Sequence, residues 1–333
     1  MKKKLTFLGI ETSCDETAAS VVQENEDGTA KVLSNVVSSQ IKEHEKFGGV
    51  VPEIAARAHV ENIDFIIQQA LNKSKKKIED IDGIAATAGP GLIVCLNVGH
   101  NIGKSLAAFS EKPFLSINHL EGHALSPGIE NKISFPYLLL LVSGGHSQYL
   151  IVKDVNNYKQ IGTTIDDAVG EAFDKTAKIL GLGYPGGPQI EKFAKLGNKN
   201  SYNLPEPIIN RAGCNLSLAG LKTAVLRKSK ELSSDKERYN LAASFQETIN
   251  KILTKKTKVA MEKFREEISS NSLRPFVVAG GVAANETIRK NLKELSKKMD
   301  FDPIFPSKEF CGDNAAMIAW AGIQRYNKKL FNV

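Results

Sequence analysis

The stretch LTFLGIETSCDETAASVV (residues 5–22) places an apolar run, a polar turn and a second apolar run one after another. The stretch YLLLLVSGGHSQYLIV (residues 137–152) repeats that order later in the chain. We interpret each as strand, polar turn and strand, because short apolar runs bounded by turn residues are typical of buried strands. The second stretch echoes the design of the first without repeating its sequence.

The chain has 333 residues, which is long for one hydrophobic core and predicts two domains. The composition shifts after Pro127, between Gly128 and Ser134, so we place the boundary there. Hydrophobic residues make up 42% and charged residues 24%, as in ordinary soluble globular proteins. The four cysteines show no C-x-x-C spacing, and Glu11 interrupts the apolar segment that follows the N-terminal lysines. We therefore expect a cytoplasmic protein with reduced thiols and no membrane association.

The net charge of +7 permits contact with a polyanion such as nucleic acid but does not demand it. Lysines gather at 75–77 and between 251 and 263. A solvated helix face accounts for such runs more often than a binding surface does. Aromatic residues are not interleaved with them, unlike in single-strand binders.

Two histidines four residues apart, His119 and His123, fall on one face of a predicted helix. Their imidazoles can hold one divalent cation and leave positions for a carboxylate, water or substrate. The alternative is two ordinary core or surface side chains. A zinc-protease motif is excluded, because Leu120 stands where that motif requires the general-base Glu.

Several predicted turns carry groups that can meet a ligand. At Ser143-Gly144-Gly145 bare backbone leaves room for a ligand and the amides suit phosphate oxygens, although a tight hairpin without ligand is the alternative. Gly280-Gly281, between a strand and a helix, forms a similar cradle, but the G-x-G-x-x-G dinucleotide pattern is absent. The turn from Glu11 to Thr17 carries three acids, of which Asp15 could act as a base; a hydrated turn is the alternative. Asp174 could hold a ribose hydroxyl or complement a helix dipole.

The remaining pattern predicts the elements between these turns. Strands are expected at 81–86, 115–117 and 275–279, and helices at 50–71, 94–109, 165–180, 221–232, 235–264 and 315–326, with another from about 286. The region from 181 to about 217 is expected to be irregular. Asp313 stands where it could cap the last helix.

Taken together, these stretches resemble one family. Its motifs appear in order as GIETSCDET (9–17), FGGVVPE (47–53) with Arg57 and His59, GPGL (89–92), His119 and His123, LVSGGH (141–146), Asp174, YPGGP (184–188), GLKT (220–223), GGVAAN (280–285) and DNAAM (313–317). They are similar to the TsaD family, the tRNA adenosine threonylcarbamoyltransferases, over nearly the whole chain. Two stretches depart from the family pattern: NLSLAGLK (215–222) stands where DFSFSGLK is usual, and Ile93-Val94 where Gly-Ser is usual.

The resemblance implies an α/β fold of the actin-like, sugar-kinase-like (ASKHA) type, with two related α/β domains around a nucleotide cleft. We expect an N-terminal domain at 1–130, completed by the C-terminal helix at 311–333, and a C-terminal domain at 131–310. The resemblance also implies one divalent metal ion per chain, held by His119, His123 and Asp313, with Fe²⁺ expected and Zn²⁺ as the alternative. The residues that it implies for the adenylate pocket are Leu141, Val142, Ser143, Gly144, Gly145, Asp174, Gly187 and Asn285.

The activity that the resemblance implies is an acyl transfer in tRNA modification. Threonylcarbamoyl passes from threonylcarbamoyl-AMP to N6 of the adenosine 3′-adjacent to the anticodon in tRNAs reading codons beginning with A, which forms t6A and releases AMP. We nominate Asp15 as general base, with Glu11 or Glu16 as alternatives. The expected protein partners are a paralogous pseudo-partner (TsaB-like) and a small ATPase (TsaE-like).

Two other classes of function stay open. An ATPase or kinase of the same fold would need Mg²⁺, which avoids imidazole ligands. The other is a metal-binding scaffold without catalysis.

Overall fold

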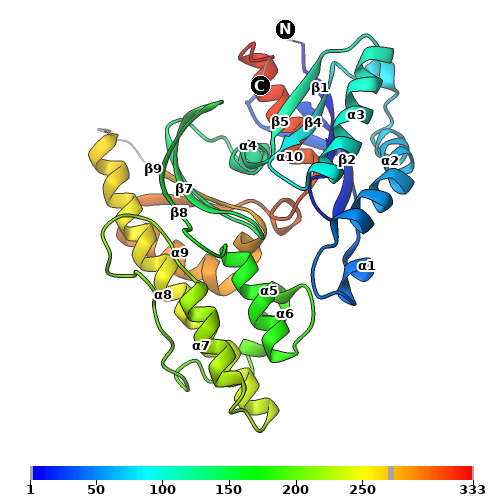
Figure 1. The fold of residues 1–333 in the computed structure, drawn as a ribbon. Coiled ribbons are helices and arrows are strands. Elements are labelled where there is room, and N and C mark those ends of the chain that lie inside the picture. Colours follow the sequence, from blue (N-terminus) through cyan, green and yellow to red (C-terminus); the bar gives the residue numbers. More distant parts are fainter. Residues whose placement is uncertain (1–2, 269–273, 332–333) are drawn as a thin grey trace. The chain divides into compact units, whose positions relative to one another are not determined.

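The computed structural model describes residues 3–268 and 274–331. The chain divides into two compact units, each built on one five-stranded sheet (Figure 1). Unit 1 comprises Met1–Ile133 and Gly312–Val333, and unit 2 comprises Ser134–Cys311. The C-terminal helix thus belongs to the same unit as the N-terminal strands.

Unit 1 contains a sheet with the strand order β3-β2-β1-β4-β5. Its strands are β1 (Thr6–Glu11), β2 (Glu16–Glu24), β3 (Ala30–Ser39), β4 (Gly83–Gly89) and β5 (Phe114–Asn118). β1, β2 and β3 pair antiparallel, and β1, β4 and β5 pair parallel. The helices are α1 (Ile41–Glu45), α2 (Pro52–Ser74), α3 (Ile93–Phe109), α4 (His119–Leu125) and α10 (Ala315–Asn327).

Successive side chains of β1 point to opposite faces of this sheet, and they show which helix covers which face. Leu8 and Ile10 join Ile63 of α2 in one hydrophobic core. On the other face, Gly9 lies against α10, since a Cβ there would stand 2.2 Å from the carbonyl oxygen of Ala315. Glu11 therefore points to the face on which α10 begins.

Unit 2 contains a sheet with the strand order β10-β9-β6-β7-β8. Its strands are β6 (Tyr137–Val142), β7 (Ser147–Asp154), β8 (Asn157–Thr163), β9 (Arg274–Ala279) and β10 (Phe301–Ile304). Its helices are α5 (Val169–Leu180), α6 (Gly186–Ala194), α7 (Ala219–Ser229), α8 (Asp235–Glu267) and α9 (Glu286–Lys298). Single 3₁₀ turns lie at Ile78–Asp80 and Ser126–Ile129 in unit 1, and at Gly281–Ala284 and Lys308–Phe310 in unit 2.

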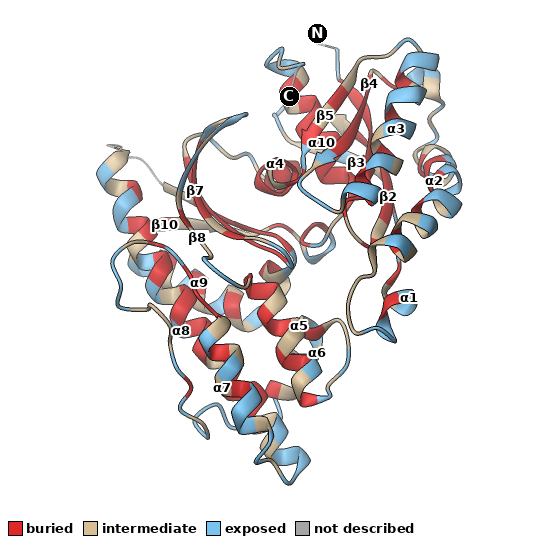
Figure 2. Ribbon diagram, in the orientation of Figure 1, coloured by how far each residue is buried: buried red, intermediate tan, exposed pale blue. Residues whose placement is uncertain are grey.

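The two sheets share one topology. In unit 2, β6, β7 and β8 pair antiparallel while β6, β9 and β10 pair parallel, as β1 to β5 do in unit 1. Figure 2 shows buried residues, in red, along strands and helices of both units. The first strand of each unit is central in its sheet and buried at every residue. This confirms the predicted echo of strand, turn and strand.

Three strands escaped the sequence analysis, and all lie at sheet edges. β3 and β8 carry many polar residues, and β10 contains Pro303, as edge strands often do. The expectation of irregular structure after residue 181 is wrong at α6. That helix opens with Gly186-Gly187-Pro188, residues typical of loops, although Pro is tolerated in a first helical turn.

The helix expected at 165–180 begins four residues later, at Val169. The reason is that the Asp166 side chain binds the segment just before α7 and not the start of α5. Its carboxylate accepts hydrogen bonds from the Leu218 N–H at 2.7 Å and the Ser217 hydroxyl at 2.5 Å, just before α7 begins. Ser217 keeps the residue that is usual in the family, while its neighbours at 215, 216, 218 and 219 depart from the family pattern, so the hydroxyl that Asp166 binds is not one of the departures. In the described ranges, 3–268 and 274–331, no helix combines the length and the apolar character needed to cross a membrane.

Candidate functional site

The helix α4 carries His119 and His123 at the carboxyl end of β5. Asn118 ends that strand and caps the helix, because its side-chain oxygen accepts hydrogen bonds from the N–H groups of Leu120 and Glu121 at 2.9 and 3.3 Å. The cap fixes where the helix starts and so brings the two imidazoles together, with ring centroids 4.7 Å apart. Both side chains are buried.

Asp313 completes this group from the start of α10. Its Oδ1 lies 3.0 Å from Nε2 of His123 and 3.5 Å from Nε2 of His119. The N-cap of α10 is Asn314, whose side chain accepts a hydrogen bond from the Met317 N–H at 3.0 Å. Asp313 is therefore not the cap, and its carboxylate faces the histidines.

Glu11 holds His119 from the other side of the ring. Its Oε2 lies 3.1 Å from Nδ1 of His119, and its Oε1 accepts a hydrogen bond from the Ser13 N–H at 2.5 Å. The Thr87 hydroxyl donates to Oε2 at 2.5 Å. A carboxylate on Nδ1 places the proton there and leaves Nε2 as an electron-pair donor, the arrangement common around metal-binding histidines.

The donor set fits a divalent cation. One ligand atom from each of His119, His123 and Asp313 can be chosen so that all lie within 4.8 Å of one another. Ligands about 2.1 Å from a shared ion stand about 3.0 to 3.4 Å apart, close to the two separations from Asp313. In the described part of the chain, Nδ1 of buried His123 has no hydrogen-bond partner, so this ring is not saturated by protein contacts. Two imidazoles and one carboxylate suit Fe²⁺ or Zn²⁺.

The charges around this cluster are strongly coupled. Burial disfavours charge on His119, but the carboxylates of Asp313 and Glu11 outweigh it and raise the pKa of His119 well above its ordinary value. Burial likewise opposes ionisation of Asp313, and the two histidines outweigh it and lower the pKa of this carboxyl. The pocket thus stabilises positive charge between the carboxylates, which is the property a cation site needs.

The candidate base Asp15 lies in the polar turn after β1 and is buried, with 8% of its surface exposed. Burial, followed by the charge of Asp15, raises the pKa of the neighbouring Cys14 thiol. Burial, followed by the nearby charges of Asp313 and Asp15, raises the pKa of Glu16 well above its ordinary value. Glu16 therefore holds its proton more tightly than an ordinary carboxyl, and Asp15 stays the nominated base with Glu16 as an alternative.

A chain of hydrogen bonds ties this turn to the start of α2. Nε2 of His59 lies 3.0 Å from the Cys14 carbonyl oxygen, which can only accept, so His59 carries its proton on Nε2. Its Nδ1 then accepts from the Thr17 hydroxyl at 2.7 Å and the Gln40 amide at 3.3 Å. Burial lowers the pKa of His59, in keeping with a neutral ring.

The predicted adenylate-binding residues all lie in unit 2, where glycines let backbones approach closely. Val142 ends β6, and the amides of Gly170 and Glu171, in the first turn of α5, donate to the carbonyls of Ser143 and Gly144 at 3.2 and 3.1 Å. A Cβ on Gly144 or on Gly145 would meet nothing within 4 Å, so the space beside this turn is open. Amides and a helix N-terminus beside open space suit an anion.

Asp174 and Asn285 both make bonds within the protein. Oδ1 of Asp174 accepts from the Gly186 N–H at 2.7 Å and so fixes the start of α6, next to Gly187. Asn285 caps α9, and its amide also donates to the Gln246 side chain at 3.0 Å. Each therefore positions a helix N-terminus, and their roles in ligand binding stay predictions.

Two features of the site were not predicted from the sequence: the orienting position of Glu11 and the buried pair of Glu121 with Arg325. Arg325 of α10 lies 2.8 Å from Glu121 of α4, and both side chains are 3% exposed. The pair joins α4, which carries both histidines, to α10, which begins two residues after Asp313. The sequence shows an acid directly after His119-Leu120, but nothing in it identified the burial of this acid or its partner.

Comparison with known proteins gives concordant results. The sequence model of the family described as TsaD, tRNA N6-adenosine threonylcarbamoyltransferase, matches residues 31–320. A protein of that name from Pelagibacter ubique (strain HTCC1062) is 58% identical over 332 residues, which cover 100% of this chain and 93% of that protein. Another from Brucella anthropi is 51% identical over 323 residues, covering 96% and 90%.

Solved structures bear on the fold alone. HypF from T. kodakarensis superposes with a TM-score of 0.63 at 14% identity, covering 98% of this chain and 48% of that one. The activator of 2-hydroxyisocaproyl-CoA dehydratase from Clostridium difficile, with bound ADPNP, gives a TM-score of 0.50 at 15% identity and covers 99% of both chains. The expected actin-like, sugar-kinase-like α/β fold is confirmed.

Proposed function

Because this chain belongs to the TsaD family of tRNA N6-adenosine threonylcarbamoyltransferases, we propose that it is an acyltransferase that forms threonylcarbamoyladenosine (t6A) in tRNA. The single observation that carries the proposal is the identity of 58% over the full chain to a protein of that name. The finer proposal is that the donor is threonylcarbamoyl-AMP and the acceptor is N6 of the adenosine 3′-adjacent to the anticodon, in tRNAs reading codons beginning with A.

The reaction makes one bond and breaks one. N6 of adenosine attacks the carbamoyl carbon, the bond from that carbon to the phosphate oxygen breaks, AMP leaves, and N6 gives up one proton. The donor is already activated, so positioning and proton removal are the main tasks of the protein. We assign proton removal to Asp15, whose buried carboxylate lies in the polar turn after β1.

We assign adenylate binding to unit 2. The turn at Ser143–Gly145 offers backbone amides beside open space, and the N-terminus of α6 at Gly186–Gly187 is held by Asp174. Amides at a helix N-terminus favour phosphate oxygens. The same proposal gives Asn285 the task of holding the start of α9 beside this turn.

His119, His123 and Asp313 would hold the one divalent ion, for which we propose Fe²⁺ with Zn²⁺ as the alternative. A bound cation supplies Lewis acidity toward an oxygen of the donor. Other residues of the chain would orient these ligands. Glu11 keeps the proton of His119 on Nδ1, and the Glu121–Arg325 pair joins α4 to α10.

We place the reaction in the cytoplasm. None of the four cysteines, which all lie in the described ranges, takes part in a disulfide, as expected in a reducing compartment. The protein partners that we propose are a paralogous pseudo-partner (TsaB-like) and a small ATPase (TsaE-like), in addition to tRNA.

Mass spectrometry of nucleosides tests the proposal. Unmodified tRNA is incubated with threonylcarbamoyl-AMP and the partner proteins, with and without this chain. We expect threonylcarbamoyladenosine only when the chain is present. If partners proven active with another family member gave no product with this chain, the transferase proposal would be wrong, and the ATPase and scaffold alternatives would be tested by ATP hydrolysis with Mg²⁺.

A further inference from the structure

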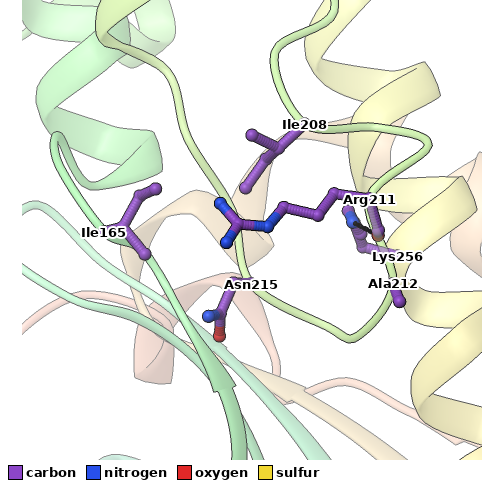
Figure 3. Close-up of a pocket in the computed structure, with 6 residues that line it drawn as sticks. All are labelled: Ile165, Ile208, Arg211, Ala212, Asn215 and Lys256. Atoms are coloured by element: carbon purple, nitrogen blue, oxygen red, sulfur yellow. Dashed lines mark hydrogen bonds between the residues drawn. The ribbon is translucent and has the colours of Figure 1, made fainter.

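A pocket of about 270 Å³ lies in unit 2, where the loop before α7 meets the end of β8 and the middle of α8 (Figure 3). Six residues line it: Ile165, Ile208, Arg211, Ala212, Asn215 and Lys256. It shares no residue with the candidate metal ligands or with the residues predicted to bind adenylate. No role has yet been assigned to it.

Lys256 brings a buried positive charge to this pocket. Its side chain is 1% exposed, and Nζ donates hydrogen bonds to the carbonyl oxygens of Arg211 and Gly213 at 2.8 and 3.2 Å. Within the described ranges, no carboxylate oxygen lies within 4.0 Å of that nitrogen. Burial lowers the pKa of Lys256, and the nearby charge of Arg211 acts in the same direction. A buried ammonium beside a second cation is costly without an anion.

Arg211 brings the second charge. Figure 3 shows its side chain crossing the pocket, with the guanidinium between Ile165 and Ile208. Across residues 3–268 and 274–331, no carboxylate oxygen lies within 4.0 Å of this guanidinium. Two acids on adjoining segments are engaged elsewhere: Glu206 with Lys251 at 3.4 Å, and Asp166 with the start of α7.

The walls of the pocket supply a neutral donor and apolar surface. Oδ1 of Asn215 accepts a hydrogen bond from the Thr163 N–H at 3.0 Å, which fixes the amide and leaves its NH₂ group as a donor. Ile165 is 54% exposed, unusually open for so large an apolar side chain. The pocket thus combines two cations, an amide donor and an apolar side, without an acid.

We propose that this pocket binds a phosphate group. A guanidinium binds phosphate oxygens through two parallel hydrogen bonds, and a nearby ammonium adds charge. Lys256 already holds two carbonyls, so Arg211 makes the direct contact and Lys256 acts through its charge. The volume lies just below the roughly 300–1,000 Å³ of pockets that enclose drug-sized ligands, so it suits one phosphate with its adjoining sugar.

The source of the phosphate that we favour rests on the proposed function. If tRNA is the substrate, its backbone offers phosphodiesters with a sugar beside each, and an exposed arginine can reach one without unfolding the RNA. A free phosphate or phosphate ester has the same chemistry and is the other source. Arg211 would then fix the register of tRNA on unit 2, since phosphate contacts position a nucleic acid rather than read its sequence.

The test compares Arg211→Gln with Arg227→Gln in the full chain. Arg227, in α7, is also exposed and does not line the pocket, so it controls for the loss of one charge. Binding of unmodified tRNA is measured by fluorescence anisotropy over a range of NaCl concentrations. We expect Arg211→Gln to bind about tenfold more weakly and to lower the slope of log K against log [salt] by about one. Arg227→Gln should behave as wild type, and Arg211→Lys should recover the slope.

A second arm titrates inorganic phosphate into the same proteins by calorimetry. If Arg211→Gln abolished phosphate binding but left the affinity for tRNA unchanged, the pocket would be a phosphate site, and its ligand would be a free phosphate or phosphate ester and not tRNA. Wild-type behaviour of Arg211→Gln in both arms overturns the proposal. Neither arm requires catalysis, so the two proposals can fail separately. If the protein made no threonylcarbamoyladenosine but Arg211→Gln still weakened tRNA binding, the proposed function would be wrong and the phosphate site would be supported. Unchanged thermal midpoints ensure that all variants are folded.

Discussion

Replacing Glu11 by Gln should weaken cation binding at His119 although Glu11 is not itself a proposed ligand. The three groups around this carboxylate are the Ser13 N–H, the Thr87 hydroxyl and Nδ1 of His119. Glutamine has the same shape but must place an NH₂ group at one of the two oxygen positions. At the Oε1 position that NH₂ would face the Ser13 N–H, which cannot rotate away.

The NH₂ group therefore takes the Oε2 position, 3.1 Å from Nδ1 of His119. There it donates to Nδ1, so the proton of the imidazole moves to Nε2, the nitrogen that faces Asp313. A protonated Nε2 cannot bind a cation. Losing such an orienting partner costs about 10- to 100-fold in metal affinity, or about 1.4 to 2.7 kcal/mol.

The assay is competition for Zn²⁺ between the protein and a chromophoric chelator, with the tautomer of His119 read from ¹⁵N shifts of the metal-free imidazole at a pH above its raised pKa, where the ring is neutral. Glu53→Gln, the same change at an exposed position of α2, is the control and should leave the affinity unchanged. If Glu11→Gln bound Zn²⁺ within twofold of wild type, with the proton still on Nδ1, the orienting role of Glu11 would be wrong.

Two further predictions concern stability. Burial lowers the folded-state pKa of His59 below its ordinary 6.5, so the free energy of unfolding should fall as the pH drops below about 6.5, where the unfolded chain takes up the proton first. Urea unfolding at several pH values checks this, and an equal slope in His59→Gln, which keeps a donor toward Cys14, would contradict it. Gly9→Ala should destabilise unit 1 by about 1–3 kcal/mol, because its Cβ would overlap the Ala315 carbonyl of α10. A thermal midpoint as high as that of Gly49→Ala, whose Cβ meets nothing within 4 Å, would refute that contact.

Where burial patterns are strong, the fold was predictable from the sequence. The apolar runs of β1 and β6 are buried at every residue, so their identity as buried strands was predictable. The edge strand β8 was not predicted, because Asn157–Thr163 contains mostly polar residues and lacks an apolar signature. The start of α5 was misplaced since Asp166 looks like an ordinary first-turn acid until its partners at the start of α7 are known.

The candidate site was also predictable from the sequence only in part. His119 and His123 were identified from local spacing, which a helix converts directly into proximity. The place of Glu11 depends on the pairing of β1, β4 and β5, which brings it beside a histidine 108 positions away. Sequence shows neither the register of those strands nor which face of β1 meets α10. The role of Glu11 therefore required coordinates.

The most direct test of the central claim, that this chain transfers its acyl group to tRNA, is the ratio of two products in one quenched reaction. AMP and threonylcarbamoyladenosine are quantified by mass spectrometry after incubation of the chain and its partner proteins with threonylcarbamoyl-AMP, with tRNA present or omitted. We expect a ratio of one to one above background, with little AMP when tRNA is omitted. Release of AMP without the modified nucleoside would contradict it and indicate a hydrolase.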